Sequence, residues 1–380
     1  MIRNLPAASA ILVSSLALAS IGIATLTPVE DLGKNLFFDT NLSTPPGQSC
    51  AACHAPEAGF TGPISDINAT TVVYPGAVHT RFGNRKPPTS AYASFSPPFH
   101  YDPDEDMYIG GQFWDGRASD LVEQAKGPFL NPLEQNNPNA KKVCIAVAHS
   151  GYAMLFRDVF GPDSLDYVKD VDGTYHRIAT AIAAYEASPE SDQFTSKFDY
   201  YQMGLVDLTP QELWGKELFE GKGKCAECHP STPGPYADKA LFTDYTYDNL
   251  GIPRNPANPF YKMPKSINPL GAAWVDLGLY WTTGRDQDKG LMKVPTLRNV
   301  DKRPYPGFVK AYGHNGFFKS LKEIVHFYNT RDVPGAGWPP PEVPENVNVD
   351  ELGNLGLTDE EEDAIVAFMT TLSDGYVLSP

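Results

Sequence analysis

Two copies of one short motif, C-x-x-C-H, are the clearest sign of chemistry in this 380-residue chain. The spacing is the attachment signal for a c-type haem, because two thiols three residues apart can each add to one vinyl group of the same porphyrin. The histidine beside the second thiol then becomes the proximal ligand of the iron. We therefore expect two covalent haem c groups. The six residues are Cys50, Cys53 and His54 in the first motif and Cys225, Cys228 and His229 in the second.

Cysteine pairs with this spacing also occur in redox sites, zinc sites and disulfide frameworks. A lone C-x-x-C serves as a thioredoxin-like redox pair or as half of a zinc site, and the two motifs together offer Cys₄. Haem attachment is favoured because each pair carries its own histidine and the pairs are too far apart for a compact zinc ribbon. Five cysteines are also few for a disulfide framework. The fifth, Cys144, lies in an apolar run and is predicted to be a buried helix residue.

A short repeat indicates how the two motifs are positioned. Gly33–Phe37 precedes the first motif and Gly215–Phe219 the second, and both read G-K-x-L-F. Each is predicted to close a short helix that leads to its cysteine pair. Thr209 is a good N-cap for the second helix and Pro210 a good first residue. The repeat predicts two related units with one haem each, residues 27–200 and 201–380.

Helices and long loops complete the predicted architecture. Further helices are expected at residues 120–126, 177–187, 321–329 and from Thr358, which opens a capping box with Glu361, to Leu372. Irregular segments at 61–100, 241–293 and 334–356 are expected to cover a cofactor or to present a partner surface. The fold class predicted is mainly α, with two cytochrome-c-like helical domains and long irregular loops.

The N-terminus has the pattern of a secretory signal. Arg3 precedes an apolar stretch from Leu5 to Leu26, and the first acidic residues follow that stretch. We expect residues 1–26 to be a signal peptide cleaved near Ala24. An uncleaved anchor is the alternative, because the stretch is nearly long enough to span a bilayer. No other run is, so no membrane span is expected after cleavage. Export to the periplasm suits haem c, which bacteria attach outside the cytoplasm.

The composition narrows the choice of partners. A formal net charge of −16 argues against a nucleic-acid partner, because phosphate groups would be repelled. The same acidity suits a soluble periplasmic protein and would steer a basic partner protein toward the surface.

Residues between the motifs distinguish an enzyme from an electron carrier. An oxidising haem enzyme needs an open iron face and a group that moves a proton between the two peroxide oxygens. From Gly33 to about Leu372, the chain resembles the bacterial di-haem cytochrome c peroxidase/MauG family. The resemblance is carried by Phe113–Ala118, Gln124, Pro128, Asn131–Glu134, Lys293–Val300 and His314–Gly316.

The resemblance implies that the first haem, held by His54, is five-coordinate and reacts with peroxide. Gln124 and Glu134 match the distal Gln and Glu of that family, and Pro128 matches a proline that lines the same pocket. Glu134 would then shuttle the peroxide proton, although a Glu after Asn-Pro is also a common helix cap. Trp114 matches the tryptophan that relays electrons between the haems. The alternative is a purely structural role, in which its side chain anchors the turn that follows it.

The sixth ligand of the second haem separates the subfamilies. In the classical peroxidases it is a methionine fourteen residues beyond a histidine that matches His314, whereas MauG-like proteins have a tyrosine there. This chain has Tyr328 at that position. A phenolate is a hard, anionic donor and stabilises high-valent iron, so the resemblance implies a bis-ferryl state shared by both haems. His326 is the rival ligand, but two residues apart on a helix the two side chains cannot face one iron.

Two further family features are uncertain in this chain. The resemblance implies a calcium ion between the haems, held by an Asn and by backbone carbonyls. Asn84 lies two residues early, with Lys86 in the expected place, so calcium through Asn84 and the carbonyls of Val309 and Ala311 is an open expectation. His79 lies near the position of a histidine that blocks the first haem in classical peroxidases, and we expect it to be a surface residue instead.

The predicted function follows from these residues. Hydrogen peroxide would drive the oxidation of an aromatic residue, first of all a tryptophan, in a small exported partner protein. The segments around Tyr101–Phe113 and Phe308–Phe318 look most like the MbnH/CorB-type branch of MauG relatives, whose partner is copper-associated. One alternative is a peroxidase that reduces hydrogen peroxide with electrons from a small cytochrome or cupredoxin. The other is a non-enzymatic electron carrier.

Overall fold

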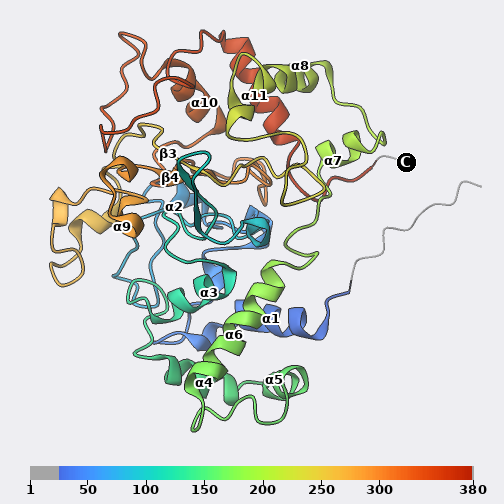
Figure 1. Ribbon diagram of the computed structural model, residues 1–380, viewed down its shortest axis with the longest axis vertical. Helices are drawn as coiled ribbons and strands as arrows, with labels where there is room; N and C mark the ends of the chain where they lie inside the picture. The colour runs from blue at the N-terminus through green and yellow to red at the C-terminus, as the bar shows by residue number, and fades with distance from the viewer. Residues whose placement is uncertain (1–24, 379–380) are drawn as a thin grey trace, which may run out of the picture.

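The computed structural model describes residues 25–378, and it shows a mainly helical chain built around two apolar cores. The first core is formed by residues between Leu32 and Tyr185 together with Leu241 and Tyr245, and the second by residues between Phe198 and Leu372. In Figure 1 the helices of the first core lie in the lower half and those of the second in the upper half. The predicted fold class is confirmed, and the domain boundary at residue 200 stays a prediction. The α-helices are α1 Pro28–Phe38, α2 Ser65–Ala69, α3 Leu121–Leu130, α4 Ala140–Ala148, α5 Ala153–Phe160, α6 Val171–Glu186, α7 Lys197–Gln202, α8 Pro210–Glu220, α9 Tyr280–Thr283, α10 Leu321–Thr330 and α11 Asp359–Thr370.

The same helix crossing occurs in both cores. Helix α1 packs on α6, and helix α8 packs on α11. Gly33 in α1 and Gly215 in α8, from the G-K-x-L-F repeat, lie at these crossings. A Cβ atom on Gly33 would overlap the carbonyl oxygen of Ala181, and one on Gly215 would overlap that of Ala364. Glycine is therefore required by close backbone approach, which explains why both copies of the repeat begin with it.

Local sequence signals place most helix ends. Thr209 is the N-cap of α8 and Thr358 opens a capping box, as predicted, and Thr209 also forms a complete capping box with Glu212. Asp120 caps α3, and Cys144 lies buried in α4. The helix expected at residues 177–187 is longer in the structure, where α6 begins at Val171. Asp170 is its N-cap, and the Asp170 side chain accepts a hydrogen bond from the backbone N–H of Gly173.

Long irregular segments fill the space between the two helical groups, as Figure 1 shows in its centre. They contain only two small antiparallel sheets among residues 25–378, β1 (His100–Asp102) with β2 (Met107–Ile109), and β3 (Tyr247–Asp248) with β4 (Met292–Lys293). Over the same residues, no single helix is long and apolar enough to cross a membrane. Helices α4 and α5 together have sufficient length and apolar composition, but they are bent by 104° relative to each other. The predicted signal peptide lies almost wholly outside the described residues.

A second structural repeat joins the loop before α3 to the loop before α10. Residues 111–130 and 311–330 have the same backbone assignment at every position, with a shift of 200 residues. Each copy closes with an isolated β-bridge, Gln112 with Ala118 and Tyr312 with Phe318. Gly116 and Gly316 share a positive φ, 69° and 62°. The two haem motifs are thus served by two copies of one loop-and-helix unit.

Candidate active site

Each C-x-x-C-H motif forms a tight turn that fixes its histidine. The first three residues of both motifs form a 3₁₀ helix. His54 donates its Nδ1–H to the carbonyl oxygen of Phe60 at 3.2 Å, and His229 donates to that of Phe242 at 2.8 Å. These bonds leave each Nε2 lone pair for a metal. Burial lowers the pKa of both histidines to about 4, so both rings are neutral at pH 7.

Two separate cavities lie against these motifs. The first is lined by Cys50, Cys53 and His54 and encloses about 1200 Å³ counted out to its mouth. The second is lined by the corresponding residues of the other motif and encloses about 1680 Å³. Each cavity therefore presents two thiols and one neutral imidazole, which is the donor set for covalent haem.

The rest of the lining also suits haem. Five basic side chains line the second cavity and would complement the acidic propionate groups. The buried Nε2 of His314 lines the same cavity and has no hydrogen-bond partner among residues 25–378. Buried polar atoms are almost always bonded, so this nitrogen indicates a polar group of the cofactor. The five basic residues are Lys86, Lys224, Lys293, Arg298 and Lys310.

The three predicted distal residues come together in the first cavity. Gln124, Pro128 and Glu134 all line it, as His54 does. Burial raises the pKa of Glu134, while the charge of Arg117 opposes the rise. Pro128, Glu134 and Arg117 also line a pocket that opens to the outside, so an outer pocket adjoins the first cavity at the residues proposed to handle peroxide.

Tyr328 lies in the second cavity, with Cys225, Cys228 and His229. His326, the rival ligand, is exposed and its Nδ1 pairs with Glu362 at 2.9 Å. The two side chains therefore leave α10 in different directions, as the helical spacing predicts. Of the two, only Tyr328 faces the cavity.

The loop-and-helix repeat relates Tyr328 to Pro128. Both are the eighth residue of their helix, α10 and α3, and both line the haem cavity of their own half. Proline has no side-chain donor atom, whereas tyrosine offers an oxygen. At the same scaffold position, one cavity therefore has no donor atom and the other has a phenol oxygen.

The repeat also relates Trp114 to His314, and these two rings meet between the cavities. Their centroids are 6.5 Å apart in an edge-on arrangement. Trp114 lines both cavities, and its Nε1–H donates to the carbonyl oxygen of Lys86 at 2.9 Å. The indole is thus placed where a relay between two haems would need it, and it is also firmly anchored.

The remaining predicted residues are His79 and the three residues expected to bind calcium. His79 is exposed and does not line the first cavity. Asn84 lines the first cavity, whereas Ala311 lines the second. The carbonyl oxygen of Val309 accepts from the side-chain amide of Asn68 at 3.0 Å. The expected calcium site of Asn84, Val309 and Ala311 stays a prediction.

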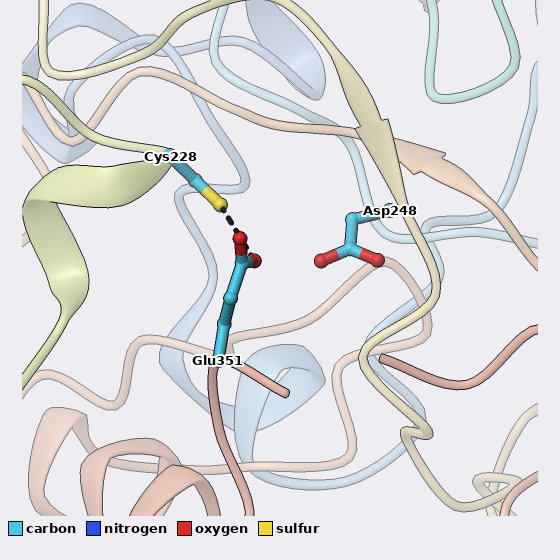
Figure 2. Close-up of side chains that lie close together, drawn as sticks. All are labelled: Cys228, Asp248 and Glu351. Carbon is cyan, nitrogen blue, oxygen red and sulfur yellow. Dashed lines mark hydrogen bonds between the residues drawn. The ribbon is translucent and has the colours of Figure 1, made fainter. Parts of the chain in front are cut away.

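A group of three acidic or sulfur ligands lies beside the second cavity. Figure 2 shows the carboxylate of Glu351 between Cys228 and Asp248. Asn348 donates to both carboxylates, at 2.8 Å to Asp248 and 2.6 Å to Glu351. Cys228 is a haem-attachment thiol in this arrangement, so its sulfur is not available to a separate metal ion.

Sequence reasoning missed a buried ion network between the two halves. Arg85 donates to both carboxylate oxygens of Asp276 at 2.6 Å and to Asp115 at 2.7 Å. All three side chains are at most 7% exposed. No local pattern reveals a pair that is 191 residues apart. Lys310 was easier to find from the sequence, because a lysine within an apolar run indicates a buried charge.

Comparison with known proteins decides the family. The model of the di-haem cytochrome c peroxidases matches residues 28–207. The methylamine utilization protein MauG of Paracoccus denitrificans is 37% identical over 365 residues, which cover 91% of this chain and 90% of MauG. The chain belongs to the di-haem cytochrome c peroxidase and MauG family. It is therefore a peroxidase-type oxidoreductase with two haem c groups.

Solved structures of relatives agree with this family. The diheme peroxidase BthA from Burkholderia thailandensis superimposes with a TM-score of 0.79 at 32% identity, covering 92% of this chain and 87% of BthA. A MauG-like protein associated with microbial copper homeostasis gives a TM-score of 0.65 at 22% identity, covering 92% of this chain and 91% of that one. This second likeness shows the fold alone, so the copper-associated substrate of the predicted branch stays a prediction.

Proposed function

We propose that this family member uses hydrogen peroxide to remove two electrons from an aromatic side chain, first of all a tryptophan, of an exported partner protein. The observation that carries the proposal is Tyr328, which faces the second cavity at the position that Pro128 holds in the first. When bound, the haems supply the iron centres that cleave the peroxide bond and hold the oxidising equivalents. A phenolate ligand favours the more oxidised iron, whereas a methionine would favour the reduced form.

The first cavity provides the groups that handle peroxide. The Gln124 amide hydrogen-bonds the peroxide, and Glu134 takes a proton from one oxygen and returns it to the other. Hydrogen peroxide gains two electrons and two protons in all and leaves as two water molecules. Burial raises the pKa of Glu134, which helps this carboxyl to hold a proton between the two transfers. The neighbouring outer pocket provides the entrance.

Electrons reach the first cavity through the wall that it shares with the second. Trp114 belongs to this wall, and Tyr328 and His229 belong to the far side of the second cavity. The partner docks on the outside of the protein, because both cavities are occupied by their haems. Its aromatic residue is the electron source, and the two water molecules are the reduced product.

The division into two units, the export signal and the location of the partner belong to the same proposal. Residues 27–200 form the peroxide-reactive unit and residues 201–380 the Tyr-ligated unit. Residues 1–26 direct export to the periplasm, where the partner is also located. The partner is a small protein, copper-associated as in the branch that the sequence resembles. Electron donation by a small cytochrome or cupredoxin, which makes the protein a simple peroxide reductase, is the competing function within this family.

Tyr328→Met is the decisive variant, with Tyr312→Phe as the control because it removes another phenol from the lining of the same cavity. The ferric wild-type protein should show one high-spin and one low-spin haem by EPR, and both signals should vanish with one equivalent of hydrogen peroxide. Tyr312→Phe should behave likewise, and Tyr328→Met should not. Mass spectrometry of a small exported protein encoded beside the gene should then show oxidation of a tryptophan by wild type alone. Two low-spin ferric haems that react only after one-electron reduction would instead establish the peroxide reductase.

A further inference from the structure

The region between the two cavities contains two lysine side chains where the family resemblance places calcium. Calcium requires six to eight oxygen ligands, usually including carboxylates, at about 2.3–2.6 Å. Of the expected donors, Val309 already accepts a hydrogen bond from Asn68, and Asn84 and Ala311 line different cavities. One of the oxygen ligands that the resemblance implies is thus already used in a hydrogen bond, and Lys86 stands in the place of the expected Asn side chain.

Lys86 lies in the wall that both cavities share. It lines each of them, together with Pro88, Thr89 and Trp114. Its backbone is fixed on both sides, because its N–H donates to the carbonyl oxygen of His314 at 2.9 Å and its own carbonyl accepts from Trp114. The side chain is thus held at the point where the two haem sites meet.

The ammonium group of Lys86 is incompletely satisfied by protein. Its Nζ donates to the carbonyl oxygen of Pro87 at 3.2 Å, the one hydrogen bond that it makes within residues 25–378. No carboxylate in this part of the chain forms an ion pair with it. An ammonium group has three donors, so two of them are left for groups inside the cavities. Haem propionates are the acidic groups that these cavities would contain.

Lys310 adds a second positive charge behind Lys86. Its buried Nζ donates to the carbonyl oxygens of Ala58, Asn299 and Lys302, at 2.9, 2.7 and 3.1 Å. Three carbonyl acceptors require three N–H donors, which only the charged ammonium has. Burial lowers the pKa of Lys310, and the charge of Lys86 adds to this effect, so the two groups are close enough to repel. A divalent cation placed beside them would be repelled by both.

We propose that the ammonium group of Lys86, supported by Lys310, is the cation between the two haem sites, and that this enzyme works without calcium. Lys86 holds the propionates of the two haems and keeps a fixed positive charge beside Trp114. This inference requires two bound haems but is independent of the substrate that the enzyme oxidises.

Elemental analysis of the holoprotein is the first test. Protein grown and purified with calcium should contain far less than one calcium per chain after dialysis. Calorimetric titration of the chelator-treated holoprotein should show no saturable binding up to about 1 mM calcium, the weak end of protein calcium sites. Chelation should leave the EPR spectrum and the melting temperature unchanged. One tightly held calcium per chain, whose removal alters the haem spectrum, would overturn the proposal.

Variants of Lys86 test the role of its charge. Lys86→Met should lower the midpoint reduction potentials of both haems, because loss of a nearby positive charge stabilises the oxidised iron. Lys86→Arg should retain the wild-type potentials. Lys265→Met is the control, since it removes the same charge from an exposed side chain. If Lys86→Met and Lys265→Met have the same potentials, Lys86 is not the inter-haem cation. The calcium measurement on wild-type holoprotein decides the matter even if Lys86→Met does not fold.

Discussion

Replacing Arg85 by methionine should lower the free energy of unfolding by about 3–5 kcal/mol, the usual cost of removing one partner from a buried ion pair. The change deletes three hydrogen bonds and leaves the carboxylates of Asp115 and Asp276 buried, at 7% and 2% exposure, without their shared cation. The network joins segments from both halves of the chain. Guanidinium unfolding of the holoprotein, followed by circular dichroism, measures the difference.

Arg117→Met provides the matched control. Arg117 also pairs with Asp115, at 2.8 Å, but its side chain is 46% exposed. Exposed pairs contribute only about 0.2–1 kcal/mol, so this variant should be several times less costly. If both variants unfold at the same denaturant concentration, the argument from burial is refuted.

The pH dependence of the Arg85 effect follows from Asp276. Burial alone would raise the pKa of this carboxyl, but the charge and hydrogen bonds of Arg85 lower it overall. Its stabilising contribution is therefore fully present above the unfolded pKa, about 3.9, and is lost as the pH falls through the lower folded value. In Arg85→Met the carboxyl of Asp276 stays buried without its cation, so its pKa is raised. The folded variant is therefore destabilised most at neutral pH, where this carboxyl must be charged. The difference between the two proteins should thus shrink from pH 7 toward pH 4.

Three further predictions use the repeats and the first cavity. Pro128→Tyr should convert the first haem to a low-spin centre and abolish its reaction with peroxide, as read by EPR and stopped-flow absorbance, because the backbone position is that of a ligand. Glu134→Gln should slow the peroxide reaction by about 10²–10⁴-fold with an unchanged ferric spectrum, and an unchanged rate would remove Glu134 from proton transfer. Gly215→Ala should destabilise the protein by about 1–3 kcal/mol or more, since its Cβ overlaps the carbonyl oxygen of Ala364. Gly127→Ala, whose Cβ meets only an ordinary contact at 3.5 Å, should be neutral or stabilising in the same thermal melts.

Local features of the fold were predictable because they depend on a few neighbouring residues. The N-cap at Thr209 and the capping box at Thr358 were predicted correctly, since a hydroxyl and a Glu three residues later satisfy each other's hydrogen bonds locally. The haem motifs are equally local, because both thiols and the histidine lie within five residues. The early start of α6 was missed because Asp170 is only one of several acidic residues able to cap it.

Long-range features were not predictable from the sequence in the same way. The ion network of Arg85 depends on a contact across 191 residues. The repeat of residues 111–130 at 311–330 is nearly invisible in the sequence, because Trp114 corresponds to a histidine and Pro128 to a tyrosine. What the copies share is the backbone, and glycines with positive φ at 116 and 316 are among its few visible marks.

This hidden repeat gives a physical reason for the different chemistry expected at the two haems. Each loop-and-helix unit presents its eighth helical residue to its own cavity, so under the proposed function a single residue type would set whether the iron is open or closed. Pro128 has no donor atom and lines the cavity that adjoins an outer pocket and contains Gln124 and Glu134, whereas Tyr328 offers an oxygen in the other cavity. The turns of the same two units bring Trp114 and His314 together between the cavities. Duplication of one scaffold, followed by substitution at two equivalent positions, is thus sufficient to separate peroxide binding from the storage of oxidising equivalents while keeping the two sites in contact.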